Sequence, residues 1–127
     1  MPRYCFALFA LCAASAAAAS GPQAQDERTM PHVAFVTGDD EYRSEVTMPM
    51  IAKILSEEHG MRTSVASAKP TPQSKEHIEG LEALDEADLM VIFTRFRQLP
   101  DEELRHILAF TKSGKPMIGL RTATHAF

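Results

Sequence analysis

Four short runs of β-forming residues alternate with stretches of helical periodicity after residue 31. The runs cover residues 32–37, 62–67, 88–94 and 117–120. The third contains five consecutive apolar residues, from Leu89 to Phe93, which indicates a parallel strand buried on both faces. The second is the weakest and is expected near an edge of the sheet. We therefore predict four strands separated by helical segments.

Two helices and one short helical turn are predicted between these strands. The first helix is expected to begin near Thr47, with Pro49 in its first turn and Gly60 after its end. Its predicted inward face is Ile51, Ile54, Leu55 and His59. The second helix is expected from Pro100, with acidic residues in its first turn and an inward face of Leu104, Ile107, Leu108 and Thr111. Leu81 and Leu84 mark the short turn.

This alternation predicts an α/β fold with an open doubly wound parallel sheet, because strands separated by helices pair in parallel through right-handed crossovers. Numbered along the chain, the four predicted strands would lie in the order 2-1-3-4. The fourth strand then has a free apolar edge, which favours aggregation unless it is covered. We therefore expect residues 21–127 to belong to a larger domain truncated on its C-terminal side.

The N-terminal segment has the composition of a secretory signal peptide. A positive start at Arg3 precedes an apolar run at residues 4–14, and small residues follow up to Ser20. The alternative is a membrane anchor, but this run is short for roughly 30 Å of hydrocarbon. We predict a signal peptide at 1–20, a flexible leader at 21–31 and a domain at 32–127. The protein would be secreted or periplasmic, with no membrane association after cleavage.

Charge and cysteine content exclude several classes of function. The chain has 13 Lys and Arg against 17 Asp and Glu, which argues against a general nucleic-acid binder. Both cysteines, Cys5 and Cys12, lie in the predicted signal peptide. The remaining chain has no thiol for a disulfide, a nucleophile or a metal site. The histidines form no metal-binding spacing, and no cofactor or metal is predicted.

Polar loops follow three of the predicted strands, and parallel strands bring their carboxyl ends to one edge of the sheet. Ligands of open α/β sheets bind there. The predicted ligand-binding residues are Gly38, Asp40, Arg43, Arg95, Arg97, Arg121 and Thr122. The candidates for acid–base catalysis are Asp39, Asp40, Glu41 and His125. Arginine forks suit carboxylates, phosphates and polyols, so we expect a small, sugar-like ligand.

Each of these groups also has a simpler interpretation. The acidic loop at 39–41 could be merely solvated, and its spacing does not match a Ca²⁺ loop. Arg95 and Arg97 could pair with Asp39 or Asp40, and His125 could be a packed histidine. Arg121 directly follows a buried strand, so its charge needs either a partner or a ligand.

Three segments together resemble the ThuA-like (trehalose-utilisation) family. They read VAFVTGDDEYR at 33–43, DLMVIFTRFRQLP at 88–100 and KPMIGLRTATHAF at 115–127. The resemblance spans nearly all of 32–127, which would be roughly the first half of such a domain. It implies the flavodoxin-like fold of class I glutamine amidotransferases and a link to carbohydrate metabolism.

The resemblance also locates one departure from those amidotransferases. They carry a cysteine in a Gly-x-Cys-x-Gly turn, whereas the turn at 119–123 places Arg121 at the position of the thiol. Glutamine hydrolysis through a thioester is therefore excluded for this chain. Two main hypotheses follow: an exported protein that binds or processes a carbohydrate-type molecule, and a non-catalytic binding or interaction module. A fragment without independent function is the third. The sequence does not predict the oligomeric state.

Overall fold

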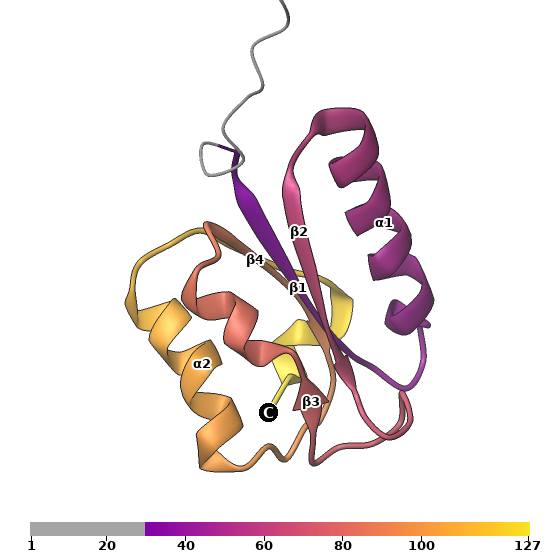
Figure 1. The fold of residues 1–127 in the computed structure, drawn as a ribbon. Helices are drawn as coiled ribbons and strands as arrows, with labels where there is room; N and C mark the ends of the chain where they lie inside the picture. Colours follow the sequence, from indigo (N-terminus) through magenta and orange to yellow (C-terminus); the bar gives the residue numbers. More distant parts are fainter. Residues whose placement is uncertain (1–29) are drawn as a thin grey trace, which may run out of the picture.

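The computed structural model describes residues 30–127, so the predicted signal peptide at 1–20 and nearly all of the leader at 21–31 lie outside the described residues. Figure 1 shows an open sheet with α1 on one face and α2 with the short helix η2 on the other. The described strands are β1 (His32–Gly38), β2 (Arg62–Ala68), β3 (Ile78–Glu79), β4 (Leu89–Thr94) and β5 (Met117–Gly119). The helices are α1 (Ser44–His59), α2 (Asp101–Lys112) and the 3₁₀ helices η2 (Leu81–Asp85) and η3 (Arg121–His125).

The sheet confirms the predicted α/β class and strand order. Its five strands lie in the order β3-β2-β1-β4-β5. β1 pairs in parallel with β2 and β4, and β5 pairs in parallel with β4. The sequence did not predict β3, which pairs antiparallel with β2 over two residues. β3 therefore occupies the edge expected for β2, and the result is a mostly parallel, flavodoxin-like sheet.

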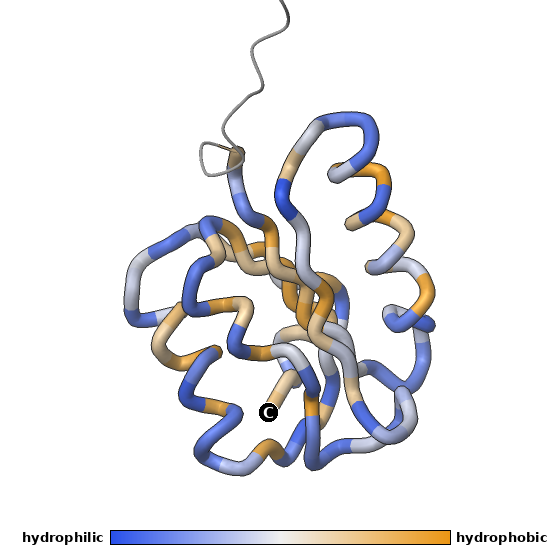
Figure 2. Tube along the Cα trace, viewed as in Figure 1, coloured by the Kyte–Doolittle hydropathy of each residue, from blue (hydrophilic) through white to orange (hydrophobic). Residues whose placement is uncertain are grey.

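The two faces of the sheet carry separate hydrophobic cores because side chains alternate along β1 and β4. Val33 and Phe35 pack toward α1, where they meet Met48 and Ala52. The intervening residues of β1 pack toward α2 and η2, in a cluster that includes Met90, Ile92, Ile107 and Phe110. All seven residues of β1 are buried. Figure 2 shows the resulting hydrophobic concentration along the central strands.

Helix α1 differs from its prediction at its start and in its orientation. It begins at Ser44, about one turn earlier than expected, so that Pro49 lies in the second turn. Its buried face is Ser44, Met48 and Ala52, whereas the predicted inward residues Ile51 and Ile54 are exposed. Small side chains at Ser44 and Ala52 flank Met48 on this face and allow a close approach to the sheet, while Ile51 and Ile54 turn outward.

Helix α2 and strand β5 border an apolar groove of about 350 Å³. The helix is close to its prediction, but Phe110 is buried instead of Leu108 and Thr111. Met117 and Ile118 on β5 are both 47 % exposed. The free apolar edge predicted for the last strand is therefore present, while membership of a larger domain stays a prediction. No helix within residues 30–127 is both long enough and apolar enough to span a membrane.

Candidate functional site

Loops that follow three neighbouring parallel strands form the candidate site, here called the rim. The loops follow β1, β4 and β5, which are adjacent in the sheet and run in the same direction. Backbone hydrogen bonds hold the loops together: the N–H of Arg95 donates to Gly38, and those of Phe96 and Arg97 donate to His125 and Ala126. The structure thus brings the predicted site residues to one end of the sheet.

Asp39 organises the loop between β1 and α1. It is 2 % exposed, and its two oxygens accept hydrogen bonds from the backbone N–H groups of Glu41, Tyr42 and Ser44. Burial alone would raise the pKa of Asp39, but hydrogen bonding from Ser44 and from the backbone of Tyr42 and Glu41 outweighs burial and lowers it. These bonds fix the loop before α1, and one of them satisfies the N–H of Ser44, the first residue of the helix, which has no partner within the helix.

Arg97 forms the buried centre of the rim. Its guanidinium lies 2.6 Å from Asp40 Oδ1 and donates another hydrogen bond to the carbonyl of Ser74. The Arg97 side chain has no exposed surface, while that of Asp40 is 28 % exposed. A side chain at Gly38 would place its Cβ 3.1 Å from Arg97 Nε. A larger residue at position 38 would therefore crowd the Arg97 side chain, which is occupied within the protein.

A second ion pair lies nearer the surface. Arg95 Nη1 is 2.7 Å from Glu41 Oε1, and the Arg95 guanidinium lies 4.9 Å from the centre of the Phe96 ring. Phe96 makes an edge contact with His125, with ring centres 5.9 Å apart. Both arginines therefore pair with the acidic loop, as the simpler interpretation expected. Arg95, however, pairs with Glu41 and not with Asp39 or Asp40.

Arg121 has a different environment from the other two arginines. It is exposed, and no carboxylate lies within ion-pair distance of it among residues 30–127. Its guanidinium lies 4.1 Å from the centre of the Tyr42 ring, which in turn stacks on Phe93. The rim thus holds one guanidinium that is positioned by an aromatic ring and is available to a ligand.

The turn that presents Arg121 is sharp and closely packed. Arg121 has a φ of 47°, in the left-handed region, and is the first residue of η3, two positions after the end of β5. A Cβ at Gly119 would lie 3.3 Å from Ala123 Cβ. Thr122 fixes the turn from its other side, because its hydroxyl donates to the carbonyl of Thr94 at 3.1 Å. This strand–turn–helix geometry lifts one side chain above the end of the sheet.

Backbone strain within residues 30–127 is concentrated at the rim. Three non-glycine residues there have positive φ, namely Arg43 at 55°, Phe96 at 49° and Arg121 at 47°. One follows each of β1, β4 and β5. Such conformations cost of order 1–3 kcal/mol each, persist only where the surrounding structure imposes them, and cluster at active sites and ligand clamps.

The remaining candidates are accessible. The Arg43 side chain is 77 % exposed and lies 4.0 Å from Glu45. His125 is exposed, and its Nδ1 lies 2.9 Å from the Thr124 hydroxyl. Of the four proposed acid–base groups, only Glu41 and His125 are exposed enough to exchange a proton with a ligand. No cluster of three or more metal-ligating side chains occurs within residues 30–127.

Aromatic side chains are the part of the rim that sequence reasoning missed. Tyr42 and Phe96 are 38 % and 47 % exposed, and each lies against an arginine. The signal available in the sequence was their position, since each is next to an arginine in a loop that follows a strand. Aromatic faces beside cations and hydroxyl-binding groups suit ligands that have both polar and apolar surfaces.

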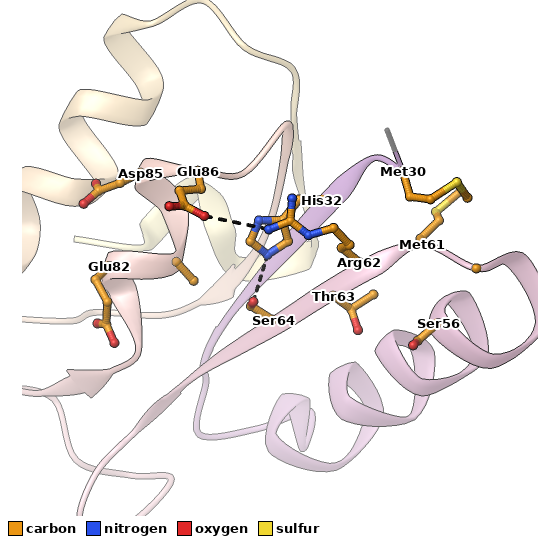
Figure 3. Close-up of a pocket in the computed structure, with 12 residues that line it drawn as sticks. Met30, His32, Ser56, Met61, Arg62, Thr63, Ser64, Glu82, Asp85 and Glu86 are labelled. Carbon is orange, nitrogen blue, oxygen red and sulfur yellow. Dashed lines mark hydrogen bonds and ion pairs between the residues drawn. The ribbon is translucent and has the colours of Figure 1, made fainter. Parts of the chain in front are cut away.

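A second hollow, of about 840 Å³, lies at the opposite, amino end of β1 and β2. Figure 3 shows His32 and Ser64 hydrogen-bonded inside it and Glu86 directed toward Arg62. His32 Nε2 and Ser64 Oγ are 2.8 Å apart, and the His32 ring is 5 % exposed. None of the left-handed non-glycine residues lies here. The hollow contains a buried polar atom without a hydrogen-bond partner among the described residues, His32 Nδ1, but it lacks the strained backbone of the rim.

No protein-family model, curated protein or solved structure matches this chain.

Proposed function

We propose that this chain is an exported ThuA-like domain protein that binds or processes a carbohydrate-type small molecule at the rim, and that it is not a glutamine amidotransferase. The observation that carries the proposal is Arg121. It is an exposed guanidinium on a strained backbone position after the edge strand β5, with an aromatic ring beneath it and no carboxylate partner among residues 30–127. A side chain held in this way is prepared for a ligand.

The charges at the rim favour a sugar-like ligand that carries an acidic group. Arg95 and Arg97 pair with Glu41 and Asp40, so Arg121 supplies the positive charge that has no ion-pair partner within residues 30–127. A guanidinium binds a carboxylate through two parallel hydrogen bonds. The partly exposed carboxylates of Asp40 and Glu41 would accept hydrogen bonds from hydroxyl groups. A sugar acid satisfies both requirements.

A catalytic role would rest on few residues. Asp39 is committed to the backbone of its loop and Asp40 to the buried Arg97. The acid–base groups would then be His125 and Glu41, whose pair with Arg95 lies nearer the surface. The thioester chemistry of amidotransferases needs a thiol, and Arg121 stands where the resemblance would put it. General acid–base chemistry on a bound sugar acid is thus the reaction type that the available groups support.

The direct test is calorimetric titration of the purified protein with uronic and aldonic acids, using the matching neutral sugars as the comparison. We expect heat of binding with an acid and at least tenfold weaker binding of its neutral analogue, equivalent to about 1.4 kcal/mol. Arg121→Ala should abolish binding. Arg105→Ala, which removes an exposed guanidinium from α2, is the matched control and should leave binding unchanged.

The alternative, a non-catalytic binding or interaction module, is favoured by one observation. Three of the four candidate acid–base groups already pair within the protein. The variant Glu41→Gln separates the two readings once a ligand is known. An enzyme would lose turnover and keep the ligand, whereas a module has no turnover to lose.

A further inference from the structure

Helix α1 has an apolar stripe on its solvent side. Val46, Met50 and Ile54 are 39 %, 59 % and 45 % exposed, and their spacing of four residues places them on one line along the helix. The opposite face is buried against the sheet through Ser44, Met48 and Ala52. A surface helix normally has an apolar face toward the core and a polar face outward. The second apolar face indicates a contact with another molecule.

A positively charged and a negatively charged residue flank this stripe, each seven residues from Met50. Arg43 lies seven residues before Met50 and Glu57 seven residues after it, and both side chains are well exposed, at 77 % and 65 %. At 3.6 residues per turn, the stripe residues and Glu57 fall within an arc of about 80°. Arg43 is the left-handed N-cap residue directly before the helix, so it marks the amino end of the stripe. Along the line, the order is positive, apolar, apolar, apolar, negative.

Two copies of this stripe are complementary when they run in opposite directions, because each positive end then meets a negative end. We propose that α1 is the interface of a homodimer in which two copies of the helix pair antiparallel about a two-fold axis at Met50. Val46 then faces Ile54 of the partner subunit, and Arg43 faces Glu57 of the partner subunit. A parallel pair would set like charges against each other at both ends. The charge pattern therefore selects both a second copy and its direction, as an isologous contact requires.

Other charged groups near the stripe leave this arrangement intact. Lys53 lies 3.8 Å from Glu57 in the same helix, so it shares that carboxylate with the incoming guanidinium. Glu45 lies 4.0 Å from Arg43 but is not on the outward line. Both pairs are exposed and weak, and therefore they allow the side chains to reorient toward a partner.

The other exposed apolar surface does not have this symmetry. Leu108, Met117 and Phe127 line the groove between α2 and β5. The charged side chain that lines it is Arg121, so pairing two copies there would bring like charges together. It provides a matched control surface for the experiment.

Sedimentation velocity of the purified protein, from about 10 μM to about 1 mM, tests the proposal. We expect a reversible monomer–dimer equilibrium. Met50→Glu places two carboxylates at the two-fold axis and should raise the dissociation constant by at least about tenfold. Leu108→Glu introduces the same charge at the other apolar surface and should leave the constant within about twofold. Circular dichroism would verify that both variants are folded.

Charge reversal tests the direction of pairing. Arg43→Glu and Glu57→Arg should each weaken the dimer, and the double variant should restore it, because each subunit then presents the reversed pair. Three results would overturn the proposal: a protein that is monomeric at every concentration, a dimer that Leu108→Glu dissociates while Met50→Glu does not, or a double variant that is no tighter than the single ones.

Discussion

The two ends of the sheet are built from similar residue types but use them differently. At the amino end, the hollow contains His32 and Ser64, which bond to each other, and Arg62 and Glu86, which face each other. At the carboxyl end, the rim contains two arginine–carboxylate pairs and a third arginine that stacks on Tyr42 without a carboxylate. The rim also holds the three strained residues.

The difference shows why the volume of a hollow is a poor guide to a site. Polar groups that satisfy one another stabilise the fold and leave little binding energy for a ligand, whereas a strained or unpaired group is unfavourable in the free protein and improves when a ligand arrives. The strained backbone and Arg121, unpaired among the described residues, therefore support our proposal that the rim is the functional end. Variants at each end test this comparison.

The largest effect is expected from Arg97→Leu at the rim. The substitution leaves Asp40 facing a less polar environment, removes the hydrogen bond to Ser74 and disturbs the packing at Gly38. Loss of one partner of a buried ion pair costs about 3–5 kcal/mol. Because Asp40 is partly exposed, we expect the lower end of that range, measured by urea unfolding. Arg95→Ala, at the surface pair, is the control and should cost less than about 1 kcal/mol.

If Arg97→Leu and Arg95→Ala were equally destabilising, the distinction that we draw between a structural arginine and a surface arginine would fail.

The next effect is expected from Asp39→Ala. It leaves three backbone N–H groups without their acceptor at the start of α1, at a cost of about 2–3 kcal/mol. Asp101→Ala, which removes an exposed carboxylate from the first turn of α2, should cost no more than about 0.5 kcal/mol. Equilibrium unfolding in urea measures both.

The pH dependence of stability provides an independent check on Asp39. Its pKa is lowered in the folded protein, so the carboxylate stabilises the fold at pH values above its unfolded pKa of about 4. That contribution is lost as the pH falls through the lower, folded pKa. Below about pH 4, the stability of the wild-type protein should fall more steeply than that of Asp39→Ala. Parallel curves would contradict the assignment.

The sequence was sufficient to predict the four parallel strands, though not β3, because the information for them is local and repeated. The apolar run from Leu89 to Phe93 and the turn signals around it defined β4, and the alternation of strands and helices determined the parallel order. The orientation of α1 could not be read in this way. Ile51 and Ile54 are more apolar than Ser44 and Ala52, but close packing on the sheet selects the smaller side chains.

The candidate site was predictable in its location but not in the roles of its residues. Position after a strand identified Asp39, Arg97 and Arg121 equally. Only the three-dimensional structure separates a carboxylate that binds its own backbone, a guanidinium that is buried against Asp40 and a guanidinium that stays accessible. Those roles depend on partners such as Ser74 and Tyr42, whose proximity no spacing along the chain indicates.

A smaller effect of opposite sign is expected from Arg121→Gly. Glycine adopts positive φ without steric cost, so the variant relieves strain at the turn and should raise stability by up to about 1 kcal/mol. It also removes the guanidinium and should abolish binding of sugar acids. Thermal unfolding and calorimetry would measure the two effects on the same preparation. Arg121→Ala, which keeps the strain, is the matched control for stability.

The smallest effect is expected at the amino end, from Ser64→Ala. The variant removes the hydroxyl that bonds to His32 Nε2, at a cost of about 1 kcal/mol, and it leaves the rim untouched. Sugar-acid binding should therefore be unchanged within about twofold, in contrast to its loss in Arg121→Ala. Calorimetric titration of both variants measures this contrast. Binding that is weakened by Ser64→Ala and retained in Arg121→Ala would move the ligand to the hollow, and it would reverse the functional assignment of the two ends of the sheet.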